Sequence, residues 1–352
     1  MVLARVFGFL RGLIFGYPRL LASEEVEFLE RVKANECPSA NISDFEFLEY
    51  FEGYFCGDRY VATLNDKRYS IIVKAKSELR AEPGRVQQTV NGKKYQYALR
   101  NDFVVKLYYS AKNINFVFLV LEHAPCGCLW DLADDDEEIL DEDTIQRIVF
   151  QVVLGLEYIH LCNLMVRHIN PDNIWLFKHG QAKIANLELA TIASDKESTP
   201  VGLPMFQAPE MVAMNFYNAA VDWWALGITI CLFGFNDYPF NATGGDDELR
   251  KSILNDPIRG IREIDISDDA LDFVERLLDK NPTKRLGSTK DGIRAIKRHP
   301  WLNKYNYMTF THPGREILRL LYRVEGESIP KGSFRGLAPD RRDLQSAEFA
   351  EF

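Results

Sequence analysis

Hydrophobic positions change their spacing about a third of the way along the chain. Short apolar runs at 71–73 and 116–121 predict buried strands. Further on, 144–159 and 221–235 are apolar at helical spacing or on nearly every side, which predicts core helices. We therefore expect an α+β fold, with a strand-rich part from about residue 45 and a larger helical part after it.

The first twenty residues, MVLARVFGFLRGLIFGYPRL, have a pattern of their own. On a helix their large apolar side chains gather on one side, and Arg5, Arg11 and the glycines gather on the other. This is typical of a helix on a membrane surface or of an organellar presequence, or else of a helix whose apolar face packs on the protein body. The two arginines argue against a membrane span.

Composition excludes a disordered, collagen-like or polytopic membrane protein, because 47% of the 352 residues are hydrophobic and 26% are charged. The formal net charge of −9 comes mainly from DDDEEILDED at 134–143, and without these eight acids it would be −1. This acidic run predicts a solvated loop or, alternatively, a surface for a basic partner. Basic residues do not cluster, so we expect no binding of nucleic acid.

Six cysteines lie far apart in the chain and form no zinc-binding or disulfide pattern. We interpret them as reduced core thiols of a cytoplasmic protein, which the segment 1–22 directs to a membrane surface or organelle if it acts as an anchor. The cysteines are Cys37, Cys56, Cys126, Cys128, Cys162 and Cys231.

Five motifs follow one another between residues 45 and 302. VRHINPDN at 166–173 is similar to the catalytic loop of protein kinases, and NLE at 186–188 stands where these enzymes have D-F-G. APE at 208–210, DWWALG at 222–227 and NPTKRLG at 281–287 follow at familiar distances. Together the five motifs make the chain resemble the protein kinase family.

KRLGSTKDGIRAIKRHPWL and the final FAEF are similar to the AGC group of kinases, above all to the cAMP-dependent kinases. This resemblance implies a bilobal fold, with a small β-rich lobe at 45–123, a helical large lobe at 124–302 and an AGC-type tail at 303–352. Residues 1–22 would form the basic amphipathic segment, and residues 23–44 an N-terminal helix and linker.

By the same resemblance, a glycine-rich loop for the phosphates of ATP should occupy 52–57. Only Gly57 of its three glycines is in register, because Glu52 and Tyr54 replace the others. Side chains at these places hinder the close approach of backbone N–H groups to phosphate, and Glu52 would repel it. Arg59 replaces the valine that covers the adenine in the family.

Lys74 matches the lysine that contacts the α- and β-phosphates. The glutamate that orients this lysine in active kinases falls at Gly92, and no acidic residue occurs from 83 to 101. We therefore expect that the usual lysine–glutamate pair cannot form from this helix.

The residues that would hold the metal and the substrate proton are also changed. Asn173 matches the ligand of the second magnesium, but Asn186 replaces the aspartate that bridges both ions, and a neutral amide binds Mg²⁺ poorly. His168, after Arg167, replaces the catalytic-base aspartate. A missing base typically costs about 10²–10⁴ in rate, so we expect no ordinary catalysis, weak or absent ATP binding and no strong Mg²⁺ site.

Ile72 and Trp175 match the residues above and below the purine. Trp175 would either stack on a purine or fill the slot as a core residue, and we favour the second. The resemblance also gives the column of side chains that stiffens an active kinase. Its members here are Gln96, Leu107, Val166 and Leu187, resting on Asp222.

Other matched residues concern regulation and structure. Thr199 matches the activation-segment phosphothreonine, for which Arg167 and Lys196 offer positive charge. Arg285 should pair with Glu210, and Phe349 and Phe352 should fold back onto the small lobe. The positions that read a basic peptide in the family keep only one acid; they are Cys128, Met205, Leu232 and Asp172.

These expectations lead to one main function and two alternatives. The main one is a catalytically impaired kinase, or pseudokinase, that binds or scaffolds protein partners in kinase signalling. The first alternative is a weak or atypical ATP-dependent serine/threonine kinase with His168 as base. The second is an adaptor that residues 1–22 recruit to a membrane.

Overall fold

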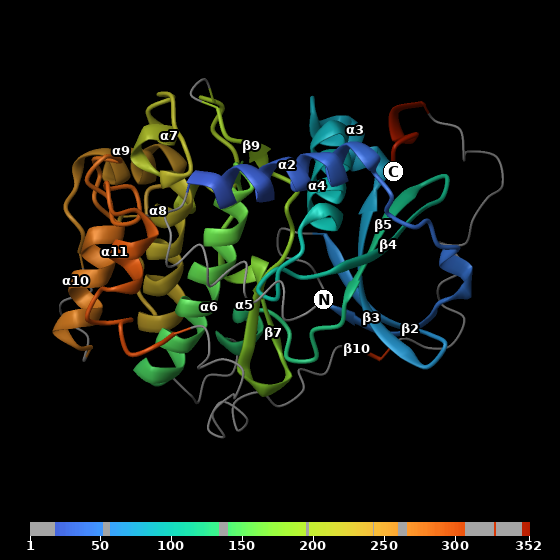
Figure 1. The fold of residues 1–352 in the computed structure, drawn as a ribbon, viewed down its shortest axis with the longest axis horizontal. Helices are drawn as coiled ribbons and strands as arrows, with labels where there is room; N and C mark the ends of the chain where they lie inside the picture. The colour runs from blue at the N-terminus through green and yellow to red at the C-terminus, as the bar shows by residue number, and fades with distance from the viewer. Residues whose placement is uncertain are drawn as a thin grey trace.

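The computed structural model describes residues 18–51, 57–133, 140–194, 197–241, 243–259, 266–306, 327–328 and 347–352. Within these residues the chain forms two lobes (Figure 1), a sheet with two short helices beside it and a larger helical lobe. The α+β, bilobal architecture that the resemblance implies is therefore present. Most of the amphipathic segment, residues 1–17, and the acidic residues 134–139 lie outside the described part.

The small lobe is built on a six-stranded antiparallel sheet with the strand order β10-β1-β2-β3-β5-β4. Residues 71–73 and 116–121 lie in β3 and β5, as predicted. Asn65 and Asp66 both have positive φ and form the two-residue turn between β2 and β3, a conformation that asparagine and aspartate tolerate well. The strands are β1 (Glu46–Phe51), β2 (Asp58–Leu64), β3 (Lys67–Ala75), β4 (Leu107–Lys112), β5 (Phe116–Glu122) and β10 (Glu327–Ser328).

Two further pairs of short strands lie on either side of the loops at 166–173 and 185–190. They are β6 (Leu164–Met165) with β9 (Thr191–Ile192), and β7 (Ile174–Phe177) with β8 (Gln181–Ile184). The helices are α2 (Pro18–Ala34), α3 (Lys76–Ala81), α4 (Arg85–Ala98), α5 (Leu129–Ala133), α6 (Glu142–Leu161), α7 (Pro209–Val212), α8 (Ala220–Thr229), α9 (Asp246–Asn255), α10 (Asp268–Leu277) and α11 (Ile293–Lys297).

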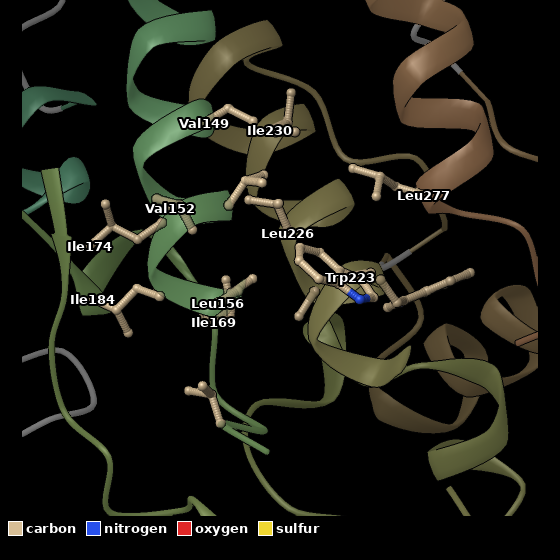
Figure 2. Close-up of a cluster of buried hydrophobic side chains, with 14 of the residues drawn as sticks. Val149, Val152, Leu156, Ile169, Ile174, Ile184, Trp223, Leu226, Ile230 and Leu277 are labelled. Carbon is tan, nitrogen blue, oxygen red and sulfur yellow. The ribbon is translucent and has the colours of Figure 1, made fainter. Parts of the chain in front are cut away.

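Helices α6 and α8 form the centre of the large lobe, as their apolar sequences predict. Figure 2 shows Val149, Val152 and Leu156 of α6 facing Leu226 of α8, with Leu277 of α10 beyond. The predicted helix at 221–235 is not uniform, because α8 is followed by a π-helical turn at Ile230–Gly234. None of the described helices is both long enough and apolar enough to cross a bilayer.

Helix α2 lies across both lobes and contacts α4 and α6 (Figure 1). Arg31 donates to the backbone oxygen of Ala98 at the end of α4 (2.7 Å), and Phe28 packs against Tyr95. The helix therefore braces α4, which carries the residues discussed below.

The last three acids of the acidic run have structural roles. Asp141 caps α6 by accepting the N–H of Thr144 (2.7 Å), and Asp143 pairs with Arg147 and Lys304. For Glu142 and Asp143, in the first turn of α6, the expectation of a solvated loop is wrong, because a helix N-terminus favours carboxylates there; Asp141 is exposed and lies just before the helix.

The described cysteines form no disulfide, and four of them are buried. Cys37 differs from the predicted core thiols in being only half-buried, and Cys56 lies outside the described residues.

Candidate functional site

The loop between β6 and β7 carries the residues that match a catalytic loop. Asp222 at the start of α8 fixes this loop, because its carboxylate accepts the backbone N–H groups of Val166 (2.9 Å) and Arg167 (2.7 Å). The same carboxylate contacts His160 Nε2 at 2.8 Å. Asp222 is fully buried, so these bonds hold the loop rigidly against the large lobe.

His168 lies on this loop in a buried environment. Burial lowers the pKa of His168 to about 4, and the positive charges of Lys74 and Arg85 act in the same direction against Glu188. At neutral pH the imidazole is therefore uncharged and a weak base. A general base is most effective when its pKa is close to the working pH, so this environment suits His168 poorly to that task.

Both asparagines expected at a metal site are buried and engaged with nearby groups. Asn173 Nδ2 donates to the backbone oxygen of His168 (2.8 Å). The side-chain oxygen of Asn186 accepts the N–H of Glu188 (3.1 Å), and Asn186 has a positive φ of 42°. Among the described residues no group of histidine, cysteine, aspartate or glutamate side chains has the arrangement of a metal site.

Lys74 of β3 forms a buried ion pair with Glu188, the last residue of the NLE motif. The distance from Lys74 Nζ to Glu188 Oε2 is 2.6 Å, and the two side chains are only 8% and 6% exposed. Thr89 of α4 donates its hydroxyl to Glu188 Oε1 (2.6 Å), and Arg85 Nε lies 3.7 Å from the same oxygen. The lysine thus has a glutamate partner, but from the segment after β8 and not from helix α4.

Gly92 makes room for this arrangement. A Cβ atom at Gly92 would lie 2.6 Å from the Cα of Glu188, closer than real Cβ contacts allow. The glycine at the expected glutamate position therefore lets the backbone of Glu188 pass directly against α4.

The charge of Glu188 is held in place by its neighbours. Burial alone would raise the pKa of Glu188, but Lys74, Arg85 and the hydrogen bond from Thr89 outweigh it and lower the pKa below its usual value. A carboxylate that stays ionised at this depth occupies the phosphate side of the cleft with negative charge. An incoming triphosphate would have to displace it from Lys74.

The two residues that match the neighbours of the purine lie in the core of the chain. Ile72 and Trp175 are each 2% exposed and belong to one apolar cluster with Leu121 and Cys128. Trp175 donates its indole N–H to the backbone oxygen of Asp172 (3.2 Å), which fixes the ring. This geometry agrees with the favoured interpretation of Trp175 as a core residue.

Arg59 of β2 lies beside Trp175 and lines a cavity of about 400 Å³ together with Phe51 and Ala124. Its guanidinium lies 5.7 Å from the centre of the Trp175 ring and 4.5 Å from that of Phe51. It also forms a 2.7 Å ion pair with Asp131 of α5, whose carboxylate accepts the N–H of Cys128 (2.7 Å). This ion pair joins β2 of the small lobe to α5 of the large lobe, beside Trp175.

Gln96 is buried in the column of otherwise apolar side chains. Its amide nitrogen donates to the backbone oxygen of Val105, while its side-chain oxygen has no hydrogen-bond partner within the described structure. Half of this buried amide is unsatisfied, which is costly. Gln96 therefore stabilises the column less than an apolar side chain of similar size would.

Other predicted residues keep structural roles. Buried Arg285 makes a bidentate pair with Glu210, at 2.7 and 2.9 Å, and its Nε donates to the backbone oxygen of Asp279 (3.0 Å). Gly57 has a φ of +91°, while the rest of the expected glycine-rich loop, including Glu52 and Tyr54, lies outside the described residues.

The chain terminus folds back onto the small lobe. Phe349 is fully buried and Phe352 is 8% exposed, in an apolar cluster with Leu79, Val90 and Val117. Lys112 Nζ donates to the backbone oxygen of Phe349 (2.6 Å). The terminal phenylalanines therefore extend the packing of α3, α4 and β5.

The comparison with known families agrees with this architecture. Residues 55–302 match the protein kinase domain family, and the match spans more than half of the chain. The chain belongs to the protein kinase family. Its ion pair between Glu210 and Arg285 and its fixed catalytic loop are thus parts of a kinase domain.

Several curated kinases are similar to this kinase domain. A protein of Caenorhabditis briggsae called "cAMP-dependent protein kinase, catalytic subunit-like" is 30% identical over 235 residues, which are 67% of this chain and 60% of that protein. Its Caenorhabditis elegans counterpart is 30% identical over 226 residues, 64% of this chain and 56% of that protein. Mouse cGMP-dependent protein kinase 2 is 33% identical over 215 residues, 59% of this chain and 27% of that protein.

The chain spans less than two thirds of the length of each of these relatives. The relatives are AGC kinases, and this kinase domain is related to that group.

Sequence reasoning did not foresee how three residues pair in the kinase cleft. Glu188 was visible as a glutamate at the usual place of the D-F-G glycine, and Arg59 as an arginine at the place of a valine. Asp131, the partner of Arg59, had no signal in the sequence, because the pairing joins residues 72 positions apart.

Proposed function

We propose that this protein is a pseudokinase, which binds or scaffolds protein partners in kinase signalling without ordinary transfer of phosphate from ATP. The observation that carries the proposal is the buried pair of Lys74 with Glu188. The lysine that kinases use for ATP phosphates is neutralised from within, and α4 is held in place without nucleotide.

The purine side supports the same conclusion. Arg59 lies over Trp175 and pairs with Asp131, so that β2 of the small lobe is tied to α5 of the large lobe. These contacts hold the two lobes together in the free protein, as a bound nucleotide holds them together in other kinases.

The four positions that read a basic peptide in the family indicate what kind of partner this protein binds. Cys128 is buried, and Met205 and Leu232 are partly buried apolar residues, so three acids of the basic-peptide site are absent. Asp172 is buried and contacts Cys128 Sγ at 3.9 Å. We therefore expect a protein partner that is not recognised through an arginine-rich substrate-like segment.

The alternative, a weak kinase, rests on the retained Lys74, Arg167 and Asn173. The low pKa of His168 and the engagement of Lys74 weigh against it. Recruitment to membranes through residues 1–22 stays a prediction, since residues 1–17 lie outside the described part.

The test is thermal unfolding of the full chain with ATP, with and without Mg²⁺. A ligand at 100 times its Kd adds about 2.7 kcal/mol, so binding would raise the unfolding midpoint by a measurable amount. We expect no shift for the natural chain. A shift that requires Mg²⁺, together with turnover that Lys74→Met abolishes, would overturn the proposal.

A matched variant makes this test sharper. Arg59→Val with Glu188→Gly restores the residue types that the family has at both places, and should gain a shift with ATP. Arg250→Val serves as the control, because Arg250 is an exposed residue of α9 and does not line the cavity beside Arg59. A shift of equal size in the natural chain and in the double variant would show that the two ion pairs do not close the cleft.

A further inference from the structure

Arg167 is a buried cation that already has its anion. Its side chain is 7% exposed, and its NH1 atom lies 3.3 Å from Glu197 Oε2. Its Nε donates to the backbone oxygen of Leu189 (2.8 Å), and NH1 also donates to the hydroxyl of Tyr217 (3.0 Å). A guanidinium without an anion at this depth would be strongly destabilising, so Glu197 is an essential partner.

Glu197 and Tyr217 together fix the segment that follows β9. The second carboxylate oxygen of Glu197 accepts the N–H of Thr199 (3.1 Å). From the other side, the backbone N–H of Tyr217 donates to the backbone oxygen of Glu197 (2.9 Å). The Tyr217 hydroxyl donates to the backbone oxygen of Thr199 (2.7 Å). One carboxylate thus links the catalytic loop to this segment.

Thr199 itself contributes only backbone groups to these contacts. Its side chain is exposed, and its hydroxyl makes no hydrogen bond within the part of the chain that the structure describes. A phosphate on Thr199 would add a charge of about −1.5 to −2. To reach Arg167, this phosphate would have to displace Glu197, or share the cation with a second negative group.

We propose that Glu197 permanently supplies the negative charge that a phosphorylated residue would supply at Arg167. The segment around Thr199 is then held in its ordered conformation without phosphorylation. The resemblance places the family's other phosphate partners at Gln88 and Thr191, which are uncharged. Lys196, the second cation named for Thr199, lies outside the described residues. The inference holds whether or not the protein transfers phosphate.

Hydrogen exchange on the full chain tests this proposal. Protein whose intact mass shows no phosphate is compared with Thr199→Ala, Glu197→Gln and the control Glu248→Gln, an exposed residue of α9. We expect protection of the Thr199 and Tyr217 amides in the natural chain, in Thr199→Ala and in the control. In Glu197→Gln the same amides should exchange about tenfold faster or more, because a charged hydrogen-bond partner is lost.

Two outcomes would overturn the proposal. One is rapid exchange at these amides in the unphosphorylated natural chain, with protection appearing only after Thr199 is phosphorylated. The other is a Glu197→Gln variant with natural protection. If Glu197→Gln does not fold, the phosphatase-treated natural protein decides alone, since the proposal expects its Thr199 and Tyr217 amides to be protected without phosphate.

Discussion

Single residues form two ion pairs within the cleft of this kinase domain. Glu188 neutralises Lys74, and Asp131 neutralises Arg59. Both pairs join segments distant in sequence, and both are largely shielded from water. Buried pairs of this kind contribute little net stability when complete, but they become costly when one partner is removed.

Removal of the Glu188 charge tests this asymmetry. Glu188→Gln keeps the shape but leaves Lys74 with a neutral partner, so we expect the free energy of unfolding to fall by about 3 kcal/mol. Urea unfolding at pH 7 measures the change. Lys74→Met combined with Glu188→Gln should lose less than the sum of the single variants, and strict additivity would show that the residues do not act as a pair.

Gly92 offers a second test at the same scale. In an exposed helix, replacement of glycine by alanine stabilises by about 1 kcal/mol, whereas here the new methyl group would collide with the backbone of Glu188. We therefore expect Gly92→Ala to destabilise the protein by about 1–3 kcal/mol.

The control for Gly92→Ala is Gln87→Ala, on the exposed side of the same helix. It should leave the unfolding midpoint nearly unchanged. A stabilised Gly92→Ala protein would mean that the backbone at Glu188 does not lie against α4.

Helices and strands determine where these residues meet. Strand β3 presents Lys74, helix α4 presents Thr89 and Arg85, and the segment after β8 brings Glu188 between them. The terminal residues complete this layer, because Phe349 and Phe352 cover the outer part of α3 and α4. The tail is thus a packing element of the small lobe.

Truncation of the buried ring of Phe349 should detach this element. Phe349→Ala typically costs about 3–5 kcal/mol for a buried phenylalanine, less if the tail undocks without unfolding the lobe. Hydrogen exchange of α3 and α4 should increase at the same time. Phe216→Ala is the matched control, since Phe216 is 68% exposed; equal effects of the two variants would contradict the docked tail.

Between pH 7 and 4.5, two histidines with lowered pKa values contribute to the pH dependence of the stability of the whole molecule. Burial lowers the pKa of His168 and of His123 to about 4 in each case. The unfolded chain binds protons near pH 6.5, before the folded chain does, so stability is full above pH 6.5 and falls as the pH decreases towards 4. Glu188, whose pKa is lowered, adds to the loss only below about 4.5.

Urea unfolding between pH 7 and 4.5 measures this loss, which we expect to be on the order of 3 kcal/mol for His168 and smaller for the less buried His123. His168→Asn should flatten the decline over this range. A decline that is unchanged in His168→Asn would place the acid sensitivity in other groups.

The sequence by itself determined the fold class, the order of the lobes and most of the altered kinase positions. Apolar runs and motifs are local signals, and they are visible without knowledge of contacts; the helices α6 and α8 and the residues Gly92, His168 and Asn186 were found in this way. The absence of a glutamate from helix α4 was equally visible, because residues 83–101 contain no acidic residue.

Only the tertiary structure decided what replaces the missing parts. Glu188 reaches Lys74 across 114 positions, Asp131 reaches Arg59 across 72, and Glu197 meets Arg167 from another loop. Charge pairing at a distance depends on where the backbone places each group, which residue types alone do not specify. The sequence showed that the usual cleft residues are altered, and the packing of the two lobes decided which side chains pair in their place.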